Sequence, residues 1–226
     1  MFQQIIQLLN DIFYPHTCPG CGNAVPGKAL LCEQCRQGIL NPRKEQQDAA
    51  LWPHLEGLFY LFNYEGGIQK ALQQVKFEHR EDLLAGLAWE WEQGLLAQNL
   101  FQWKFPQNIR VSFVPIPTDP RRVRQRGYEV PVEIFRPWCL KQGYTWDVLL
   151  KRVKATKPQF SLSPKERKEN IKDCFALSRK TSLPDIVVLL DDIATTGATL
   201  EEAAKVLRKA GVKYVYAAAL ASGRNL

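Results

Sequence analysis

Apolar positions in the last part of the chain alternate between strand-like and helix-like patterns. The segment DIVVLLDD at 185–192 is apolar throughout its middle, which is typical of a strand buried on both faces of a parallel sheet. Residues 199–210 show helical spacing that ends at Gly211, and VKYVYAAALA at 212–221 predicts a last strand. Strands that alternate with helices predict an α/β fold with a mainly parallel sheet flanked by helices.

The middle of the chain continues this alternation. The aromatic run GLFYLFNY at 57–64 predicts a strand, and apolar residues at steps of three and four predict a helix over 66–99. RVSFVPIP at 110–117 predicts a short strand that its prolines bring to an end. Residues 121–142 are mostly helical in pattern, although the prolines within the segment interrupt it.

Local signals predict three further elements. Ser163 can cap a helix that starts at Pro164, and Glu166 completes a capping box. CFAL at 174–177 is a candidate strand. Apolar residues at helical spacing between 2 and 13 predict a short docking helix. A membrane-surface helix is less favoured there, because the polar face carries no Lys or Arg.

The composition is that of an ordinary globular protein. The sequence has 226 residues, of which 46% are hydrophobic and 23% charged, and its length suits one sizeable domain or one domain with a small appendage. No apolar run approaches the roughly 18 residues that a membrane span needs. The first residues lack the basic segment and the cleavage site of a secretion signal, so we expect a cytoplasmic protein without a membrane span.

Positive charge is concentrated in the middle of the chain. The formal net charge is +7, but residues 104–180 hold 18 Lys or Arg against 7 Asp or Glu, a surplus of +11, and the remainder stands at −4. Such a segment favours polyanionic partners, namely phosphates, pyrophosphate or nucleic acid. For any single Lys or Arg, a solvated helix face is the simpler explanation.

Four of the six cysteines form two CxxC pairs ten residues apart: Cys18, Cys21, Cys32 and Cys35. Four thiolates at this spacing complete the tetrahedral shell that Zn²⁺ prefers and leave no open position, so we expect a structural zinc. Redox motifs and disulfides are the alternatives, but redox motifs usually occur singly and disulfides do not suit a cytoplasmic protein. Cys139 and Cys174 stand alone in apolar surroundings, where buried structural cysteines are expected.

Two adjacent carboxylates follow the apolar run. Because the buried strand is expected to end at Leu190, Asp191 and Asp192 should emerge in a surface loop at the carboxyl end of the sheet, where open α/β folds bind ligands. The turn that follows suits a phosphate through its backbone N–H groups, its hydroxyls and the helix dipole: Thr195, Thr196, Gly197, Ala198 and Thr199. Carboxylates beside a phosphate are explained if they accept hydrogen bonds from vicinal ribose hydroxyls. The stretch VVLLDDIATTGATLEE therefore predicts a site for a ribose 5-phosphate.

Other phosphate-binding motifs do not match this stretch. A P-loop needs GxxxxGK[ST] with its lysine, and a dinucleotide fingerprint needs three glycines. An ordinary strand, an acidic turn and a Thr-capped helix remain the alternative without a ligand. The two adjacent acids followed by TTGAT make that alternative the less favoured one.

The stretch VVLLDDIATTGAT resembles the phosphoribosyl pyrophosphate (PRPP) motif of type I phosphoribosyltransferases. The chain as a whole resembles the ComF family, which is similar to amidophosphoribosyltransferases and is associated with competence and DNA uptake. This resemblance spans nearly the whole chain and is carried by the cysteine module, VKF (75–77), VPIPTDPRRVRQRGY (114–128), and Gln159, Arg167 and Asn170 in QFSLSPKERKEN. Glu129 and Val130 depart from the Asn-Gln that usually follows RGY or RGF in the family.

The resemblance implies two regions and a ligand. Residues 1–45 are expected to form an N-terminal helix and a zinc-binding module, and residues 46–226 a phosphoribosyltransferase-like domain whose segment 51–105 supplies a hood over the acceptor. The expected ligand is PRPP with Mg²⁺. Its pyrophosphate should meet a basic region in which forked guanidinium groups pair with phosphate oxygens: Lys76, Thr118, Asp119, Arg121, Arg122, Arg124 and Arg126.

Two classes of function follow. The chain is either an enzyme, namely a Mg²⁺-dependent phosphoribosyltransferase or a hydrolase of the same ligand, or a non-catalytic PRPP- or nucleotide-binding protein that binds single-stranded DNA during natural transformation. A third alternative is a structural partner of other proteins of the competence machinery. We assign neither a covalent nucleophile nor an acceptor.

Overall fold

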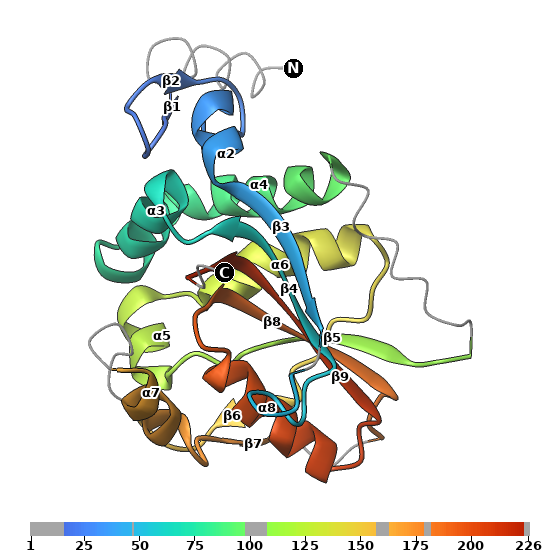
Figure 1. Ribbon diagram of the computed structural model, residues 1–226. Coiled ribbons are helices and arrows are strands. Elements are labelled where there is room, and N and C mark those ends of the chain that lie inside the picture. Colours follow the sequence, from blue (N-terminus) through green and yellow to red (C-terminus); the bar gives the residue numbers. More distant parts are fainter. Residues whose placement is uncertain (1–15, 47, 98–107, 157–162, 179–181, 224–226) are drawn as a thin grey trace.

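The computed structural model describes residues 16–46, 48–97, 108–156, 163–178 and 182–223 (Figure 1). The docking helix expected between residues 2 and 13 and the side chain of Gln159 lie outside the described residues. Among the helices of the described ranges, none combines the length and the apolar character that a membrane crossing requires.

A five-stranded sheet forms the centre of the molecule (Figure 1). Its strands, in order across the sheet, are β3 (Leu40–Gln46), β4 (Gly57–Asn63), β9 (Tyr214–Ser222), β8 (Ile186–Ala194) and β5 (Val111–Pro115). The pairs β4–β9, β9–β8 and β8–β5 are parallel, and the edge strand β3 runs antiparallel to β4. The predicted mainly parallel sheet is therefore confirmed.

Three helices cover one face of this sheet: α3 (Gly66–Phe77), α4 (Leu84–Ala97) and α6 (Val130–Lys141) (Figure 1). Their apolar side chains form one core with Val188 and Leu190 of β8. Within this core Trp91 and Phe135 meet edge to face, with 4.8 Å between the ring centroids. Such pairs contribute beyond the area they bury.

The prediction of one continuous helix over 66–99 is wrong. Helix α3 ends at Phe77, and a short 3-10 turn, η1 (Glu81–Leu83), precedes α4. The polar stretch EHRED at 78–82 has no apolar side chain to hold a helical turn against the sheet, and His79 adopts a positive φ of 57°.

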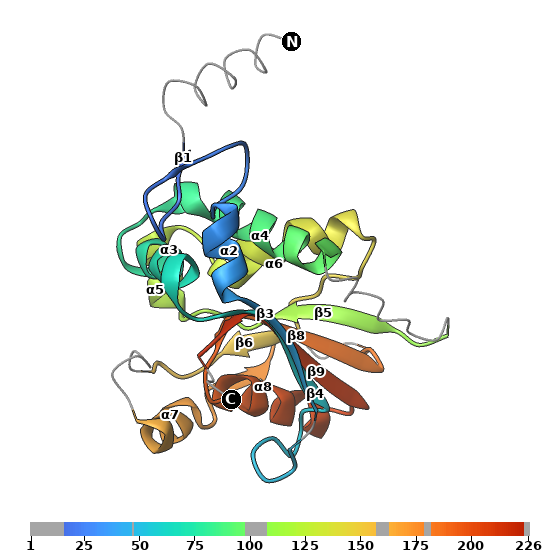
Figure 2. The same ribbon diagram turned by 45° about the horizontal axis from the view of Figure 1, so that its top comes forward.

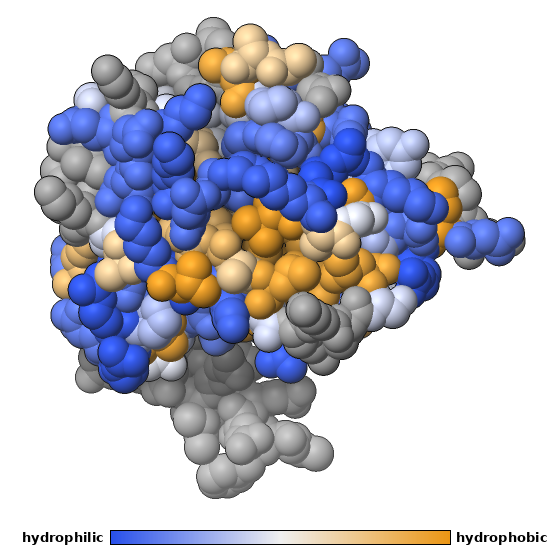
Figure 3. Space-filling model, turned by 90° about the horizontal axis from the view of Figure 1, so that it is seen from below, coloured by the Kyte–Doolittle hydropathy of each residue, from blue (hydrophilic) through white to orange (hydrophobic). Residues whose placement is uncertain are grey.

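The other face of the sheet carries α8 (Ala198–Lys209), which Figure 2 shows opposite α3, α4 and α6. A small antiparallel sheet of β6 (Leu150–Arg152) and β7 (Phe175–Leu177) shares its core, together with Val187 and Leu189 of β8. Seen from below, hydrophilic side chains on this side surround a band of apolar ones (Figure 3). Because alternate residues of β8 enter the two cores, its continuous apolar run is explained.

Prolines and caps set the remaining helices. Two helices, α5 (Pro120–Arg126) and α6, replace the interrupted helix predicted over 121–142. Pro131 lies in the first turn of α6, where a missing N–H costs nothing, and Pro137 lies inside that helix. The predicted capping box is confirmed at α7 (Pro164–Ile171), where Glu166 accepts a hydrogen bond from the Ser163 backbone N–H at 2.8 Å.

Strand β8 is longer than expected. The prediction that it ends at Leu190 is wrong, because the strand continues to Ala194 in parallel register with β9 and places Asp191 opposite Ala219. Carboxylate side chains do not interrupt the ladder, which depends on backbone groups that β9 continues to pair. The two acids therefore lie within a strand and not in a surface loop.

The cysteine-rich segment folds into β1 (His16–Thr17), β2 (Ala24–Val25) and α2 (Glu33–Ile39) beside α3 and α4 (Figure 1). The chain then continues as β3, so this strand spans the boundary predicted at residue 45, which stays a prediction. Glu90 of α4 is fully buried and accepts backbone hydrogen bonds from Leu30 (3.0 Å) and Leu31 (2.9 Å). Its other oxygen forms an ion pair with Arg36 at 2.7 Å from Nε, so this one carboxylate ties the cysteine segment to the helical layer.

Candidate functional site

The carboxyl ends of the four parallel strands meet at one edge of the sheet, beside a cavity of about 600 Å³. Every one of these strands contributes to the lining: Tyr64 follows β4, Thr118 follows β5, Thr195 follows β8, and Ser222 ends β9. This is the edge at which open α/β sheets bind ligands. Asp191 and Asp192 both line the cavity.

The two acids project to opposite faces of β8, because side chains alternate along a strand. Asp192 lies on the α3 side, is 6% exposed, and forms an ion pair in which Lys76 Nζ is 2.7 Å from its Oδ2. Asp191 lies on the α8 side and accepts a hydrogen bond from the backbone N–H of Asp192 at 2.9 Å. Burial and the neighbouring carboxylate of Asp192 raise the pKa of Asp191 well above its ordinary value. Lys76, expected near the pyrophosphate, is thus placed against the acid pair.

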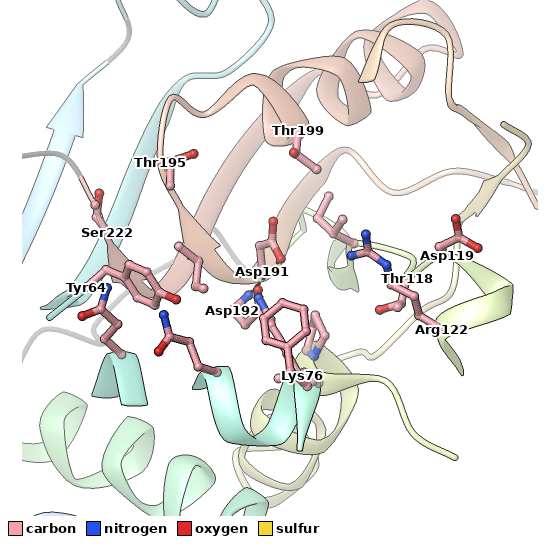
Figure 4. Close-up of a pocket in the computed structure, with 18 of the residues that line it drawn as sticks. Tyr64, Lys76, Thr118, Asp119, Arg122, Asp191, Asp192, Thr195, Thr199 and Ser222 are labelled. Carbon is pink, nitrogen blue, oxygen red and sulfur yellow. Dashed lines mark hydrogen bonds and ion pairs between the residues drawn. The ribbon is translucent and has the colours of Figure 1, made fainter. Parts of the chain in front are cut away.

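The turn between β8 and α8 presents Thr195 and Thr199 to the cavity, and Figure 4 shows them on the opposite side of the acids from Lys76. Gly197 is the N-cap of α8 and has a φ of +73°, a conformation that favours glycine. The Thr196 hydroxyl accepts a hydrogen bond from the backbone N–H of Ala198 at 3.3 Å. Of the five predicted turn residues, Thr196, Gly197 and Ala198 do not line the cavity.

Helix α5 divides its arginines between two directions. Arg122 and Arg126, four residues apart on one helix face, line the cavity. Arg121 and Arg124 do not line it and are exposed. Burial and the nearby charge of Arg122 lower the pKa of Arg126, whose Cζ lies 5.9 Å from the centroid of the Phe77 ring. The structure therefore brings two of the four predicted arginines to the cavity.

The loop after β5 is held by two carboxylates. Asp119 caps α5 and pairs with the guanidinium of Arg121, with 2.8 Å between Nη2 and Oδ2, and this interaction lowers the pKa of Asp119 to about 2. Glu129 accepts a hydrogen bond from the backbone N–H of Thr118 at 2.9 Å. Glu129, which departs from the family pattern, thus fixes the loop, and Val130 is buried in the lining.

Two further arginines line the cavity outside the predicted set, namely Arg152 and Arg167. Burial lowers the pKa of Arg152, which donates a hydrogen bond to Thr156 Oγ1 at 2.5 Å and lies with its Cζ 5.5 Å from the centroid of the Phe175 ring. The resemblance singled out Arg167, whereas Arg152 stands in a three-residue strand without a sequence signal. With Arg122 and Arg126, four arginines face one cavity.

At the opposite end of the cavity, the described lining residues include polar side chains of α3. Helix α3 presents Gln69 and Gln73 to it from one helix face, close to Tyr64. Figure 4 shows the two ends on either side of the acid pair: Tyr64 and Ser222 on one side, and Thr118, Asp119 and Arg122 on the other. No periodic signal in the sequence distinguishes these glutamines from solvated residues.

The four cysteines of the CxxC pairs converge, with all their Sγ atoms within 4.8 Å of one another. A Cβ at Gly20 would lie 2.9 Å from Cys35 Sγ, so glycine leaves the room that the cluster needs. Although burial opposes it, hydrogen bonds from the backbone of Cys32 and Cys21 lower the pKa of Cys18 to about 7. Four thiolates this close require a cation between them, and four sulfur ligands are a set that Zn²⁺ prefers, so the cluster supports the expected structural zinc.

The two isolated cysteines are fully buried, as expected. Burial raises the pKa of Cys139 to about 12 and that of Cys174 to about 11, so both remain protonated thiols at neutral pH.

Comparison with known proteins finds one family match for the cysteine segment and another for the part of the chain that contains the acid pair. The double zinc ribbon domain family matches residues 9–46, and the phosphoribosyl transferase domain family matches residues 151–225. The second match contains β8, the turn after it and β9.

Relatives that align along most of their length are named for DNA utilization and for competence. The DNA utilization protein YhgH of Salmonella typhimurium is 29% identical over 204 residues, 88% of this chain and 86% of that protein. Competence protein F of Haemophilus influenzae is 29% identical over 206 residues, 88% of this chain and 81% of that protein. A YhgH protein of Escherichia coli is 27% identical over 201 residues, covering 88% and 80%. The resemblance to the ComF family is confirmed.

Proposed function

We propose that this ComF-like chain binds PRPP at the carboxyl edge of its sheet and, with Mg²⁺, transfers the phosphoribosyl group to an acceptor or releases it to water. The observation that carries the proposal is the lining of one cavity of about 600 Å³ by the turn after β8, two adjacent acids and four arginines. PRPP presents a matching set of groups, namely a phosphate, two vicinal hydroxyls and a pyrophosphate.

Each group of the ligand has a counterpart. The 5-phosphate would lie at the turn, with hydroxyls from Thr195 and Thr199 and the positive end of the α8 dipole. Asp191 and Asp192 would accept hydrogen bonds from the ribose hydroxyls. The pyrophosphate would lie at the α5 end, where Arg122 faces it with a forked guanidinium group.

The chemistry asked of the protein is mainly positioning and charge stabilisation. The bond between ribose C1 and the pyrophosphate oxygen breaks, the pyrophosphate leaves with both electrons, and the acceptor forms a new bond to C1 and releases a proton to the solvent. Positive charge develops on the ribose ring meanwhile, and Asp191 would stabilise it in its ionised form, which the nearby cation of Lys76 favours. The end of the cavity with Tyr64, Gln69 and Gln73 would hold the acceptor across from the departing pyrophosphate.

Magnesium fits this site as an ion that arrives with the ligand. Among the described residues, the cysteine cluster is the one group of potential ligands that gathers closely enough to form a metal cage. Mg²⁺ typically binds through one or two carboxylates together with substrate phosphates, and Asp191 and Asp192 line the cavity. When bound, the ion would neutralise the charge of the leaving pyrophosphate.

The test is to incubate the protein with PRPP and Mg²⁺ and a panel of nucleobases, ammonia or water alone, and to measure pyrophosphate. Calorimetry with PRPP runs in parallel. Wild-type protein should bind PRPP and release pyrophosphate, and Arg122→Gln should lower both signals, whereas Arg124→Gln, on the outer face of the same helix, should not. Binding without pyrophosphate release would disprove transfer, and no binding would disprove the site.

A second function is favoured by a separate observation. Arg121 and Arg124 are exposed outside the cavity, in the segment that carries a surplus of +11. Homologues are named for DNA utilization and competence. We propose that this outer basic surface binds single-stranded DNA in the cytoplasm, with or without other proteins of the competence machinery.

The DNA proposal is tested by fluorescence anisotropy with a labelled oligonucleotide at several salt concentrations. Affinity should fall steeply as salt rises, because phosphate contacts release counterions. Arg124→Gln should reduce the slope and Arg122→Gln should not, the reverse of the pattern for PRPP. Affinity that ignores salt, or that is absent at low salt, would count against it.

A further inference from the structure

We propose that Trp52 is a positioning residue that holds the turn at 195–199 in its anion-binding form, acting from the loop between β3 and β4. This inference rests on the proposed function in that it takes the turn to be the phosphate site. The indole Nε1 donates a hydrogen bond to the backbone carbonyl of Thr196 at 3.1 Å. The two residues are 144 positions apart in the sequence, so the contact depends on the tertiary fold.

The indole also meets the turn by close packing. A Cβ added at Gly197 would lie 2.4 Å from Nε1 of Trp52 and 2.8 Å from its Cε2. The absence of a side chain at Gly197 therefore serves two needs, the φ of +73° and the room for the indole. Trp52 itself is 2% exposed and does not line the cavity, so it touches the turn from the side away from the ligand.

The loop that carries Trp52 is itself fixed. The backbone N–H of Trp52 donates a hydrogen bond to the carbonyl of Asp48 at 2.6 Å. Two residues further along the chain, His54 Nδ1 lies 2.5 Å from Oε1 of Glu201, which stands in the first turn of α8. The backbone N–H of His54 donates to the other oxygen of Glu201 at 3.2 Å. The loop is thus hydrogen-bonded both to the turn, through Trp52, and to the start of α8, through His54.

These contacts give the turn its shape before a ligand arrives. A phosphate that meets the hydroxyls of Thr195 and Thr199 already in place does not have to order the turn on binding, so less conformational entropy is lost and the affinity is higher. Trp52 would act on ligand affinity through the turn, without touching the ligand.

The test uses Trp52→Phe, which keeps an aromatic ring and removes the N–H donor. Calorimetry measures two probes separately, ribose 5-phosphate for the turn and pyrophosphate for the arginine end. The variant should bind ribose 5-phosphate about threefold to tenfold more weakly, the effect of one neutral hydrogen bond, and pyrophosphate as the wild type does. Trp89→Phe, the same change on α4 away from the cavity, should alter neither affinity.

The outcomes separate this inference from the proposed function. If wild-type protein binds neither probe, the proposed function fails. If it binds both and Trp52→Phe binds them equally well, or loses both alike, Trp52 does not position the turn. If circular dichroism shows that Trp52→Phe folds poorly, His54→Ala is used in its place, because it removes the contact between the loop and Glu201. This variant must then show the same selective loss of affinity for ribose 5-phosphate. If His54→Ala shows no selective loss of affinity for ribose 5-phosphate, the proposal is overturned.

Discussion

Replacing Asp191 by Asn is expected to stabilise the free protein at neutral pH and to weaken its binding of ribose 5-phosphate. Among the described residues, the ammonium of Lys76 pairs with Asp192, which leaves Asp191 without an ion pair of its own. Asn has nearly the shape of Asp and can still accept the hydrogen bond from the backbone N–H of Asp192. The substitution therefore removes one charge that Lys76 and Arg152 compensate only in part, and little else.

The size of the stabilisation follows from how incompletely the charge of Asp191 is compensated. A charged group that is buried without full compensation costs about 1–3 kcal/mol or more, and the partial exposure of Asp191 and its hydrogen bond from Asp192 place it toward the lower end of that range. We expect a gain of about 1–2 kcal/mol in the free energy of unfolding. In a protein of this size, that corresponds to a rise in Tm of about 2–8 °C.

The gain should depend on pH in a defined direction. The pKa of Asp191 is raised in the folded state by burial and by the Asp192 carboxylate, so folding favours the protonated acid. That contribution is fully present below the pKa of the unfolded chain, about 3.9, and is lost as pH rises through the folded pKa. The advantage of Asn over Asp should therefore be near zero at about pH 4 and largest above the folded pKa of Asp191.

The assay is thermal denaturation followed by circular dichroism at several pH values, with calorimetry of ribose 5-phosphate at neutral pH. Asp82→Asn serves as the matched control, because Asp82 is half exposed and its surface pair with Arg80 contributes about 0–1 kcal/mol. A Tm that falls or stays level at neutral pH, in a variant with wild-type dichroism, would refute the reasoning. So would a gain of the same size at pH 4.

Three further changes have defined outcomes. Lys76→Met should lower the free energy of unfolding by about 3–5 kcal/mol, since Asp192 is left buried without its partner. Adding Asp192→Asn should restore most of the lost stability in thermal denaturation, and no recovery in the double variant would contradict this reasoning. Gly197→Ala should cost about 1–3 kcal/mol from the positive φ alone and should weaken ribose 5-phosphate binding, as denaturation and calorimetry would show; unchanged stability would refute the conformational argument. Removing zinc with a chelator should abolish hydrogen-exchange protection first in the cysteine segment and in α4 around Glu90, and later in β8 and β9; full protection after metal loss would exclude a structural role.

Much of the fold was predictable because its signals are local. The apolar run of β8, the caps of α7 and the CxxC spacing each follow from a few neighbouring residues, and all three appear in the structure. The prediction of one helix missed the break between α3 and α4, although the polar residues at 78–82 that interrupt the apolar period are a sequence signal for it. The end of β8 was misplaced because backbone pairing with β9, and not side-chain polarity, decides where that strand stops.

The candidate site divides in the same way. Asp191, Asp192 and the turn after them are contiguous in sequence and were found together. Arg152 and Trp52 reach the site from separate segments, and only the tertiary fold brings them there. On α5 the helical period separates Arg122 from its exposed neighbour Arg121, but sequence alone does not say which face meets the cavity.

The position of β9 between β4 and β8 has a consequence for how the chain is made. β9 follows both neighbours in the sequence, so during synthesis β4 and β8 emerge from the ribosome before the strand that joins them. Until β9 inserts, both present unpaired edges and apolar faces, the kind of surface on which nascent chains associate wrongly. The ligand edge is incomplete over the same interval, because Ser222 belongs to that late strand. A chain interrupted before residue 214 would therefore be both unable to bind and prone to aggregate.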